Sequence, residues 1–387
     1  MREPSPPAIF RLWPVAVALV MLMGSLLIGI LASPFPSRSA SAAMPLLLGL
    51  ALLALLVFRP AARPSPRRAT DTLALLGVGI AALGFVGMLA KPTVLFPSLQ
   101  RMLLALQSVL GVRLERLPDT FHPNVVAGAI LLLFPFVLVP GLAPGPLPPH
   151  LDRVRRALYL GAASIMAAVL ILTQSRGAYL GLIVAGLVLS ASLKPRLLLL
   201  FGPLLCIGGI AAYAILGGSQ FGDALVSADP AQGLAWRRQI WAVGWRMAED
   251  MSLTGIGFGQ FHAVQTVLYP LPLGEAAGHV HNLYLQILLD LGLGGSIGFL
   301  IILGLAWAHS LRALSNRPRT LSEHRHLAAA CVASLAGMCT HGLLDAAVWG
   351  NKAAWLMWIV LGLAIGLADQ ETARGRSRPL GDSDAVQ

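Results

Sequence analysis

The sequence predicts an all-α polytopic membrane protein with about ten transmembrane helices and a large external loop that contains interfacial helices. Its 387 residues are 56% hydrophobic and only 12% charged, and the mean hydropathy is +0.75. Soluble domains carry about 25% charged residues. A spanning helix needs about 20 residues, so the shorter apolar windows are expected to extend further than they first appear. The ten windows are residues 12–31, 44–58, 73–90, 125–139, 157–173, 179–193, 197–216, 283–307, 327–344 and 353–367.

The distribution of basic residues sets the expected orientation. The formal net charge of +11 would suit a nucleic-acid partner, but Lys and Arg are sorted by loop. With the N-terminus inside, every loop predicted to be cytoplasmic is basic, as the positive-inside rule requires. We therefore expect an even number of spans, both termini in the cytoplasm and no nucleic-acid partner.

The first window could instead be a cleavable signal peptide, because residues 39–42 (Ser-Ala-Ser-Ala) resemble a cleavage site. Its apolar core is longer than the 7–15 residues usual in a signal peptide, so we expect the span to be retained. Residues 1–367 then form a single transmembrane helical domain. Residues 368–387 are predicted to be a disordered cytoplasmic tail.

Two external connections are long enough to cover an active site, namely residues 91–123 and 217–281. In the first, residues 99–117 alternate apolar and polar side chains, which predicts an amphipathic helix lying on the membrane. The connection ends in His122-Pro123-Asn124, at the mouth of the fourth span.

Residues 234–250, in the second connection, are predicted to form a helix. At 100° per residue Arg238 shares a face with Trp241 and Trp245, whereas Arg237 points away. Tryptophan prefers the headgroup level of a membrane, so Arg238 is expected at the outer interface. A helix that merely anchors the loop, with its arginine on ordinary lipid phosphate, is the alternative.

The glycine-rich run at residues 255–259 (Gly-Ile-Gly-Phe-Gly) superficially matches a nucleotide-binding loop. A dinucleotide fingerprint follows a strand and opens a helix, and this run does neither clearly. We expect its glycines to permit a tight turn near the active surface.

The run from Gly278 to Asn282 closes the second connection and leads directly into an apolar helix. His279 and His281 can exchange protons near neutral pH, and they share a face if the run is extended. Together with Glu275 they could imitate a metal site, but catalytic zinc normally has three protein ligands, so no metal is predicted. Asn282 is expected to cap the helix that begins at Leu283.

Four further polar groups are placed at or within spans. Arg176 occupies a tight external turn, where it could serve function or anchor the helix at the interface. Asp290 lies about two turns into a span, and Asp345 follows His341 near the outer end of another. Asp290, His341 and Asp345 could pair with external arginines, but packing within the bundle is their expected role.

Several short motifs, taken together and in order, resemble the O-antigen ligase and O-antigen polymerase superfamily. The resemblance covers about residues 121–366. In this sequence Ser252 stands where the family often has proline, and ten spans are fewer than the twelve common among ligases. The matching segments are residues 122–124, 175–177, Arg238 to Trp241 leading into 254–259, 279–286 with 292–294, and 341–345.

The resemblance implies an enzyme of the bacterial inner membrane that transfers a glycan from a polyprenyl diphosphate carrier, such as undecaprenyl diphosphate, at the periplasmic face. It implies that Arg176 and Arg238 bind the diphosphate and that His281 deprotonates the acceptor hydroxyl, with inversion at the anomeric carbon. Arg237 and His279 are second choices for these roles. A good leaving group, fixed positive charge and one base suffice without a metal or other cofactor. Supporting roles are expected for Asn282, Asn124, His122 and Asp345.

The acceptor defines the subtype. A lipid A core sugar makes the protein a ligase of lipopolysaccharide biosynthesis, which the resemblance favours. A second carrier-linked glycan would make it a polymerase, and a protein hydroxyl an oligosaccharyltransferase. A transporter of lipid-linked glycans should show inverted repeats and charges lining a path through the membrane. Only Asp290 lies well inside a span, and no half of the sequence is repeated. An assembly scaffold would not need Arg176, Arg238 or His281 individually.

Overall fold

The computed structural model describes residues 8–90, 97–110, 122–193, 234–271, 277–315 and 323–376. Within these ranges all regular secondary structure is helical, which confirms the all-α prediction. The described residues form one short 3-10 helix, η1 (Pro60–Ala62), and thirteen α-helices. These are α1 (Ala8–Ala32), α2 (Pro36–Ala42), α3 (Met44–Phe58), α4 (Pro66–Ala90), α5 (Pro97–Leu110), α6 (Pro123–Leu142), α7 (Pro149–Leu172), α8 (Arg176–Leu193), α11 (Leu234–Asp250), α12 (Phe261–Leu268), α13 (Leu283–Ser315), α14 (Glu323–Gly342) and α15 (Trp355–Arg376).

Six helices of the described residues are long and apolar enough to cross a membrane, namely α1, α4, α6, α7, α8 and α13. The pair α2 and α3, bent by 44°, makes a seventh if it is one span. The predicted windows 327–344 and 353–367 correspond to α14 and α15, and the window 197–216 lies outside the described residues. The chain is therefore a polytopic membrane protein, and the count of ten spans stays a prediction.

Helix α14 occupies the middle of the bundle and packs against α6, α8 and α13. Small residues let these helices approach closely, as is usual in membranes. A Cβ added to Gly181 of α8 would lie 2.7 Å from the carbonyl oxygen of Gly337 in α14. Similarly, α3 accommodates the buried indole of Trp358 at Gly49. Glycines thus let neighbouring helices of the bundle pack closely.

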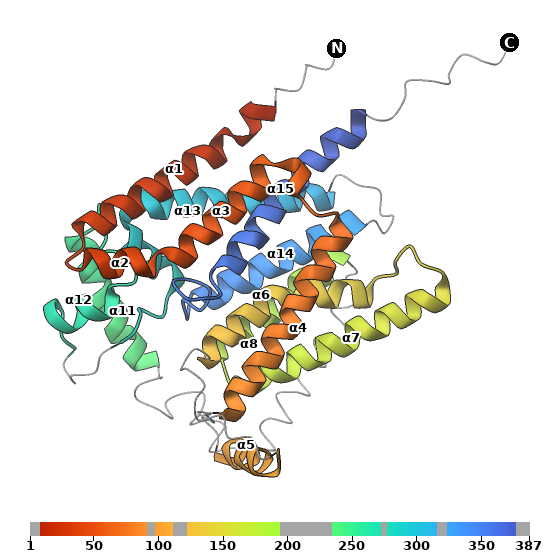
Figure 1. Ribbon diagram of the computed structural model, residues 1–387, viewed down its shortest axis with the longest axis horizontal. Coiled ribbons are helices and arrows are strands. Elements are labelled where there is room, and N and C mark those ends of the chain that lie inside the picture. Colours follow the sequence, from red (N-terminus) through yellow and green to blue (C-terminus); the bar gives the residue numbers. More distant parts are fainter. Residues whose placement is uncertain are drawn as a thin grey trace.

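The first turn of α1 and the last turn of α15 lie at the same end of the bundle, and α5, α11 and α12 lie toward the opposite end (Figure 1). This arrangement agrees with an even number of crossings. The predicted tail begins at residue 368, but α15 continues to Arg376, so the first part of that tail is helical. Good helix formers such as Ala368, Glu371 and Arg374 account for this extension.

The glycine-rich run joins α11 to α12 and packs against α13. Gly255, Gly257 and Gly259 all have positive φ, which confirms the predicted tight turn. Gly292 breaks α13 with φ 65° and ψ −170°. Around that break Leu293 N donates to Ser252 O (2.8 Å), and Ile256 N donates to Leu289 O (2.7 Å). The loop that holds α11 is thereby fixed to a membrane helix.

Candidate active site

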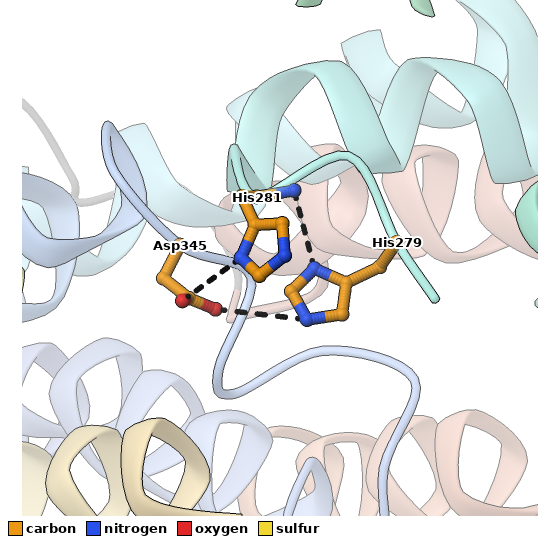
Figure 2. Close-up of side chains that lie close together, drawn as sticks. All are labelled: His279, His281 and Asp345. Carbon is orange, nitrogen blue, oxygen red and sulfur yellow. Dashed lines mark hydrogen bonds and ion pairs between the residues drawn. The ribbon is translucent and has the colours of Figure 1, made fainter. Parts of the chain in front are cut away.

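The histidine run has a defined local structure. Asn282 Oδ1 accepts a hydrogen bond from Leu285 N (3.0 Å), so the predicted helix cap is confirmed. His281 adopts φ 50°, a left-handed conformation that is uncommon outside glycine. Its backbone N donates to His279 Nδ1 (3.1 Å), and the two imidazole centroids are 3.9 Å apart. The turn therefore brings both rings to the same side of the chain (Figure 2).

Asp345, in the loop after α14, joins the two histidines to the start of α6. Its side chain is buried, and its Oδ2 accepts from Asn124 Nδ2 (2.7 Å) and contacts His281 Nδ1 (3.2 Å). Its Oδ1 lies 3.9 Å from His279 Nε2 (Figure 2). Sequence reasoning expected this carboxylate to pack or to pair with an arginine. The structure instead gives it the two imidazoles.

Electrostatics keep this carboxylate charged. Burial by itself raises the pKa of Asp345, but the hydrogen bond from His281 and the neighbouring imidazoles outweigh it and hold the pKa below its ordinary value. Partial burial lowers the pKa of His279, and His281 lowers it further, against the opposing effect of Asp345. At neutral pH the site therefore combines a carboxylate with a neutral His279.

The hydrogen bonds also fix the tautomers. A carboxylate only accepts, so the proton of neutral His281 is on Nδ1, and its Nε2 carries a lone pair. His279 Nδ1 accepts a backbone N–H, so the proton of that neutral ring is on Nε2, which faces Asp345. Of the two histidines, His281 is therefore the one with a ring nitrogen available as a base.

Helix α11 lies over the histidine run. Trp236 packs edge-on against the His281 ring with centroids 5.4 Å apart, and Trp241 Nε1 donates to His281 O (3.4 Å). On its inner side α11 packs Ile240, Val243 and Met247 into a small core with α12. These contacts set the rotation of α11 about its axis.

This rotation places the two adjacent arginines differently. Arg238 is exposed, as is Trp245 on the face they share. Arg237 is half-buried and interacts electrostatically with Asp345 and Arg176. Burial, with Arg176, lowers the pKa of Arg237, and Asp345 opposes the shift. The helical wheel grouped Arg238 with the tryptophans. The inward face of α11 is instead set by its aliphatic residues, so Arg237 is the arginine beside the cluster formed by His279, His281 and Asp345.

Arg176 begins α8, directly after Gln174, which has φ 55°, and Ser175. It is half-buried and close enough to Arg237 for the two charges to repel. Two guanidinium groups held near each other are stabilised by a shared anion. Arg237 Nε is buried without a hydrogen-bond partner among the described residues. Such a donor is expected to gain a partner when an anion binds.

His122 stands at the edge of the cluster. Its Nδ1 accepts from Asn124 N (3.3 Å), so the ring caps α6. Burial and His281 lower the pKa of His122, and Asp345 raises it. Together with Asn124, which supports Asp345, it ties α6 to the histidines.

Sequence reasoning did not recognise a buried polar network beneath the histidine run. Gln286 Oε1 accepts from Val280 N (2.9 Å), between the two histidines, and Gln286 Nε2 donates to Asp290 Oδ1 (3.0 Å). Asp290 also accepts from Gly259 N (3.0 Å) and from Trp349 Nε1 (2.7 Å). Asp290 thus holds the run, the glycine turn and the α14–α15 loop together. The i, i+4 spacing of Gln286 and Asp290 was the available signal.

His341, near the end of α14, packs inside the bundle, as the sequence predicted. It is 3% exposed, and its Nε2 has no hydrogen-bond partner within the described ranges. Its ring fits between two glycines, since a Cβ at Gly177 would lie 2.8 Å from His341 Cδ2 and one at Gly128 would lie 3.2 Å from Cε1. His341 therefore packs against the residue that follows Arg176.

Residues 161–300 match the family model described as O-antigen ligase. This match supports the resemblance of the chain to the O-antigen ligase superfamily. No curated protein matches the chain.

The O-antigen ligase match contains Arg176, Arg237, Arg238 and both histidines of the run. Asn124 and Asp345, which complete the hydrogen-bonded cluster, come from outside it. The donor atoms of His279, His281 and Asp345 lie within 4.8 Å of one another, so this trio also has the composition of a metal-binding site. The site therefore depends on helices on both sides of the matched segment.

Proposed function

We propose that the protein is an inverting, metal-independent glycosyltransferase that moves a glycan from a polyprenyl diphosphate carrier to a hydroxyl of the lipid A core, as an O-antigen ligase. The observation that carries the proposal is the contact between His281 Nδ1 and Asp345 Oδ2, which leaves the lone pair of His281 on Nε2 as a base, while Arg237 interacts electrostatically with Asp345 and Arg176. The match of residues 161–300 to the O-antigen ligase family supports the class of reaction.

The diphosphate binds between Arg176 and Arg237 in this proposal. Guanidinium forks suit phosphate oxygens, and the mutual repulsion of the two charges is relieved by an anion. Charge that develops on the leaving diphosphate meets these fixed donors, which is where electrostatic stabilisation contributes most. Arg238 is exposed and contacts lipid or carrier phosphate at the rim.

His281 Nε2 takes the proton of the acceptor hydroxyl while the oxygen attacks the anomeric carbon. The bond between that carbon and the diphosphate oxygen breaks, its electron pair leaves with the diphosphate, and the configuration inverts. Asp345 stabilises the imidazolium that forms and holds the ring in the reactive tautomer. His279 orients the turn through its hydrogen bond from His281 N.

The end of the bundle that carries α5, α11 and α12 faces the periplasm in this proposal, and both termini lie in the cytoplasm of a bacterial cell. The basic loops predicted to be cytoplasmic support this orientation. On α5, Met102 is 51% exposed and Val109 is 82% exposed, which suits contact with membrane lipid.

Deletion in the native host, followed by analysis of surface glycans, tests the acceptor. A ligase deletion leaves long glycans unligated on the carrier. Single repeats on the lipid would make the protein a polymerase, and loss of a glycoprotein would make it an oligosaccharyltransferase. Purified protein with a carrier-linked glycan tests the mechanism, because loss of transfer in EDTA would overturn metal independence.

Substitution of the base completes that test. We expect His281→Ala to abolish transfer, while His150→Ala, which removes an exposed imidazole in the first turn of α7, retains it. Wild-type transfer by His281→Ala would remove the base assignment.

A further inference from the structure

We propose that His279, His281 and Asp345 capture one divalent cation of the zinc or copper class, and that the bound cation blocks transfer. The capture step stands on the geometry of the trio. The inhibition step rests on the function proposed above, because it requires His281 to be the base.

The distances in the trio fit a small cation. Zinc binds imidazole nitrogen and carboxylate oxygen at about 2.0–2.2 Å, so donors in a tetrahedral site are about 3.3 Å apart. His281 Nδ1 and Asp345 Oδ2 are 3.2 Å apart, and His279 Nε2 is 3.9 Å from Asp345 Oδ1. The three donor atoms lie within 4.8 Å of one another, so His279 must move inward to complete the site, and three protein ligands leave a fourth position for water.

The ligand types and their support favour this cation class. Two imidazoles with one carboxylate suit zinc and copper better than magnesium or calcium, which prefer oxygen ligands. Asn124 Nδ2 orients Asp345 by a hydrogen bond of 2.7 Å, as the outer partners of metal ligands do. The His279 side chain is 36% exposed, so an ion from solution can reach the trio.

Capture reverses the tautomer that transfer requires. A cation on His281 Nδ1 occupies the lone pair there, so the neutral ring must carry its proton on Nε2. Nε2 then donates and cannot accept the proton of the acceptor hydroxyl. The cation therefore inhibits transfer by binding His281 Nδ1, which removes the lone pair from Nε2.

Two opposing effects keep the affinity below that of a structural zinc centre. To ligate through Nε2, His279 must carry its proton on Nδ1 and lose the hydrogen bond from His281 N. Arg237, which interacts electrostatically with both His279 and Asp345, also repels a cation. A bound diphosphate neutralises that repulsion, so we expect the donor-loaded enzyme to bind the cation more tightly than the free enzyme.

Direct metal titration tests the capture step. The probe is Co²⁺ followed by its visible absorption, and then Zn²⁺ in competition, with full-length, chelator-treated protein in detergent and with any polyhistidine tag removed. We expect one equivalent to bind. Loss of one outer partner of a ligand typically costs 10–100-fold in affinity, so His279→Gln and Asp345→Asn, each of which removes a ligand, should weaken it by at least about 100-fold. His150→Gln, the matched control outside the trio, should bind as the wild type does.

The outcomes separate the two steps. Absence of saturable Co²⁺ uptake, or equal uptake by the ligand variants, overturns the capture site. In the transfer assay Zn²⁺ should inhibit the wild type with a midpoint that follows the binding midpoint, and EDTA should restore the rate. Binding without inhibition overturns the block. A chelated enzyme that is inactive with every carrier-linked donor overturns the proposed function while the metal titration still decides the capture step.

Discussion

Replacing Asp345 by asparagine tests the catalytic arrangement most directly. The amide keeps the size of the side chain but presents one acceptor oxygen and one N–H₂ in place of two carboxylate oxygens. The contact with His281 Nδ1 is 3.2 Å, and Asn124 Nδ2 competes for the same oxygen at 2.7 Å. An amide oxygen at the Oδ2 position still accepts from both groups, but the neutral amide no longer supplies the negative charge that stabilises the imidazolium forming on His281. The base is then weakened.

The size of the effect follows from the role of the carboxylate. General base catalysis contributes about 10²–10⁴-fold, and misorienting a catalytic histidine by the same acid-to-amide change in a serine protease costs about 10⁴-fold. We expect kcat for Asp345→Asn to fall by about 10²–10⁴-fold, or about 3–5 kcal/mol at 1.36 kcal/mol per tenfold. The arginines are untouched, so KM for the donor should change little.

The assay is transfer of a fluorescent glycan from its polyprenyl diphosphate carrier under single-turnover conditions, with thermal unfolding as the check on folding. Asn124→Asp serves as a comparison, since it removes the competing donor and places a second carboxylate beside Asp345. Wild-type kcat for Asp345→Asn in a folded protein would refute the reasoning. A fall confined to donor affinity would also refute it, because Asp345 would then act on binding.

Three further predictions concern binding, pH and packing. Arg237→Ala should raise the donor KM at least about tenfold, and more than Arg238→Ala, because Arg237 is beside the cluster while Arg238 is exposed. Below about pH 6.5 the unfolded chain protonates His279 before the folded protein does, so thermal stability should fall as pH falls, and His279→Gln should flatten this slope. Gly292→Ala should lower the free energy of unfolding by at least about 1–3 kcal/mol, because the φ of Gly292 is 65° and an added Cβ would clash with the backbone of Leu253. Gly304→Ala, in open space on the same helix, should not.

Each of these has a clear contrary result. A larger KM effect for Arg238→Ala than for Arg237→Ala would return the diphosphate to the exposed face of α11. A wild-type slope of melting temperature against pH in His279→Gln would exclude His279 as its source. Equal melting temperatures for the two glycine variants would show that the break in α13 tolerates a side chain.

The helical class and the local features of the site were predictable because they depend on residues close in sequence. Apolar length indicated membrane helices, and the Asn282 cap involves a partner three residues away. The positive φ values of the glycine turn follow from residue type. The order of the motifs was sufficient to suggest the superfamily that residues 161–300 match.

The arrangement of the catalytic groups was not predictable in the same way. Asp345 meets His281 across 64 positions and Asn124 across 221, and no local periodicity encodes such contacts. The helical wheel for α11 predicted which residues share a face. The aliphatic contacts between α11 and α12 decided that Arg237 points inward.

The sequence by itself determined a polytopic helical membrane protein, the histidine run with its helix cap, and a set of arginines suited to an anion. Local propensity and apolar length are sufficient for these properties. Only the tertiary structure decided which nitrogen of each histidine is free, because tautomers depend on the partner that packing supplies. Helix packing also brought Asp345 to the run and selected Arg237, since both depend on the rotation and depth of whole helices in the bundle.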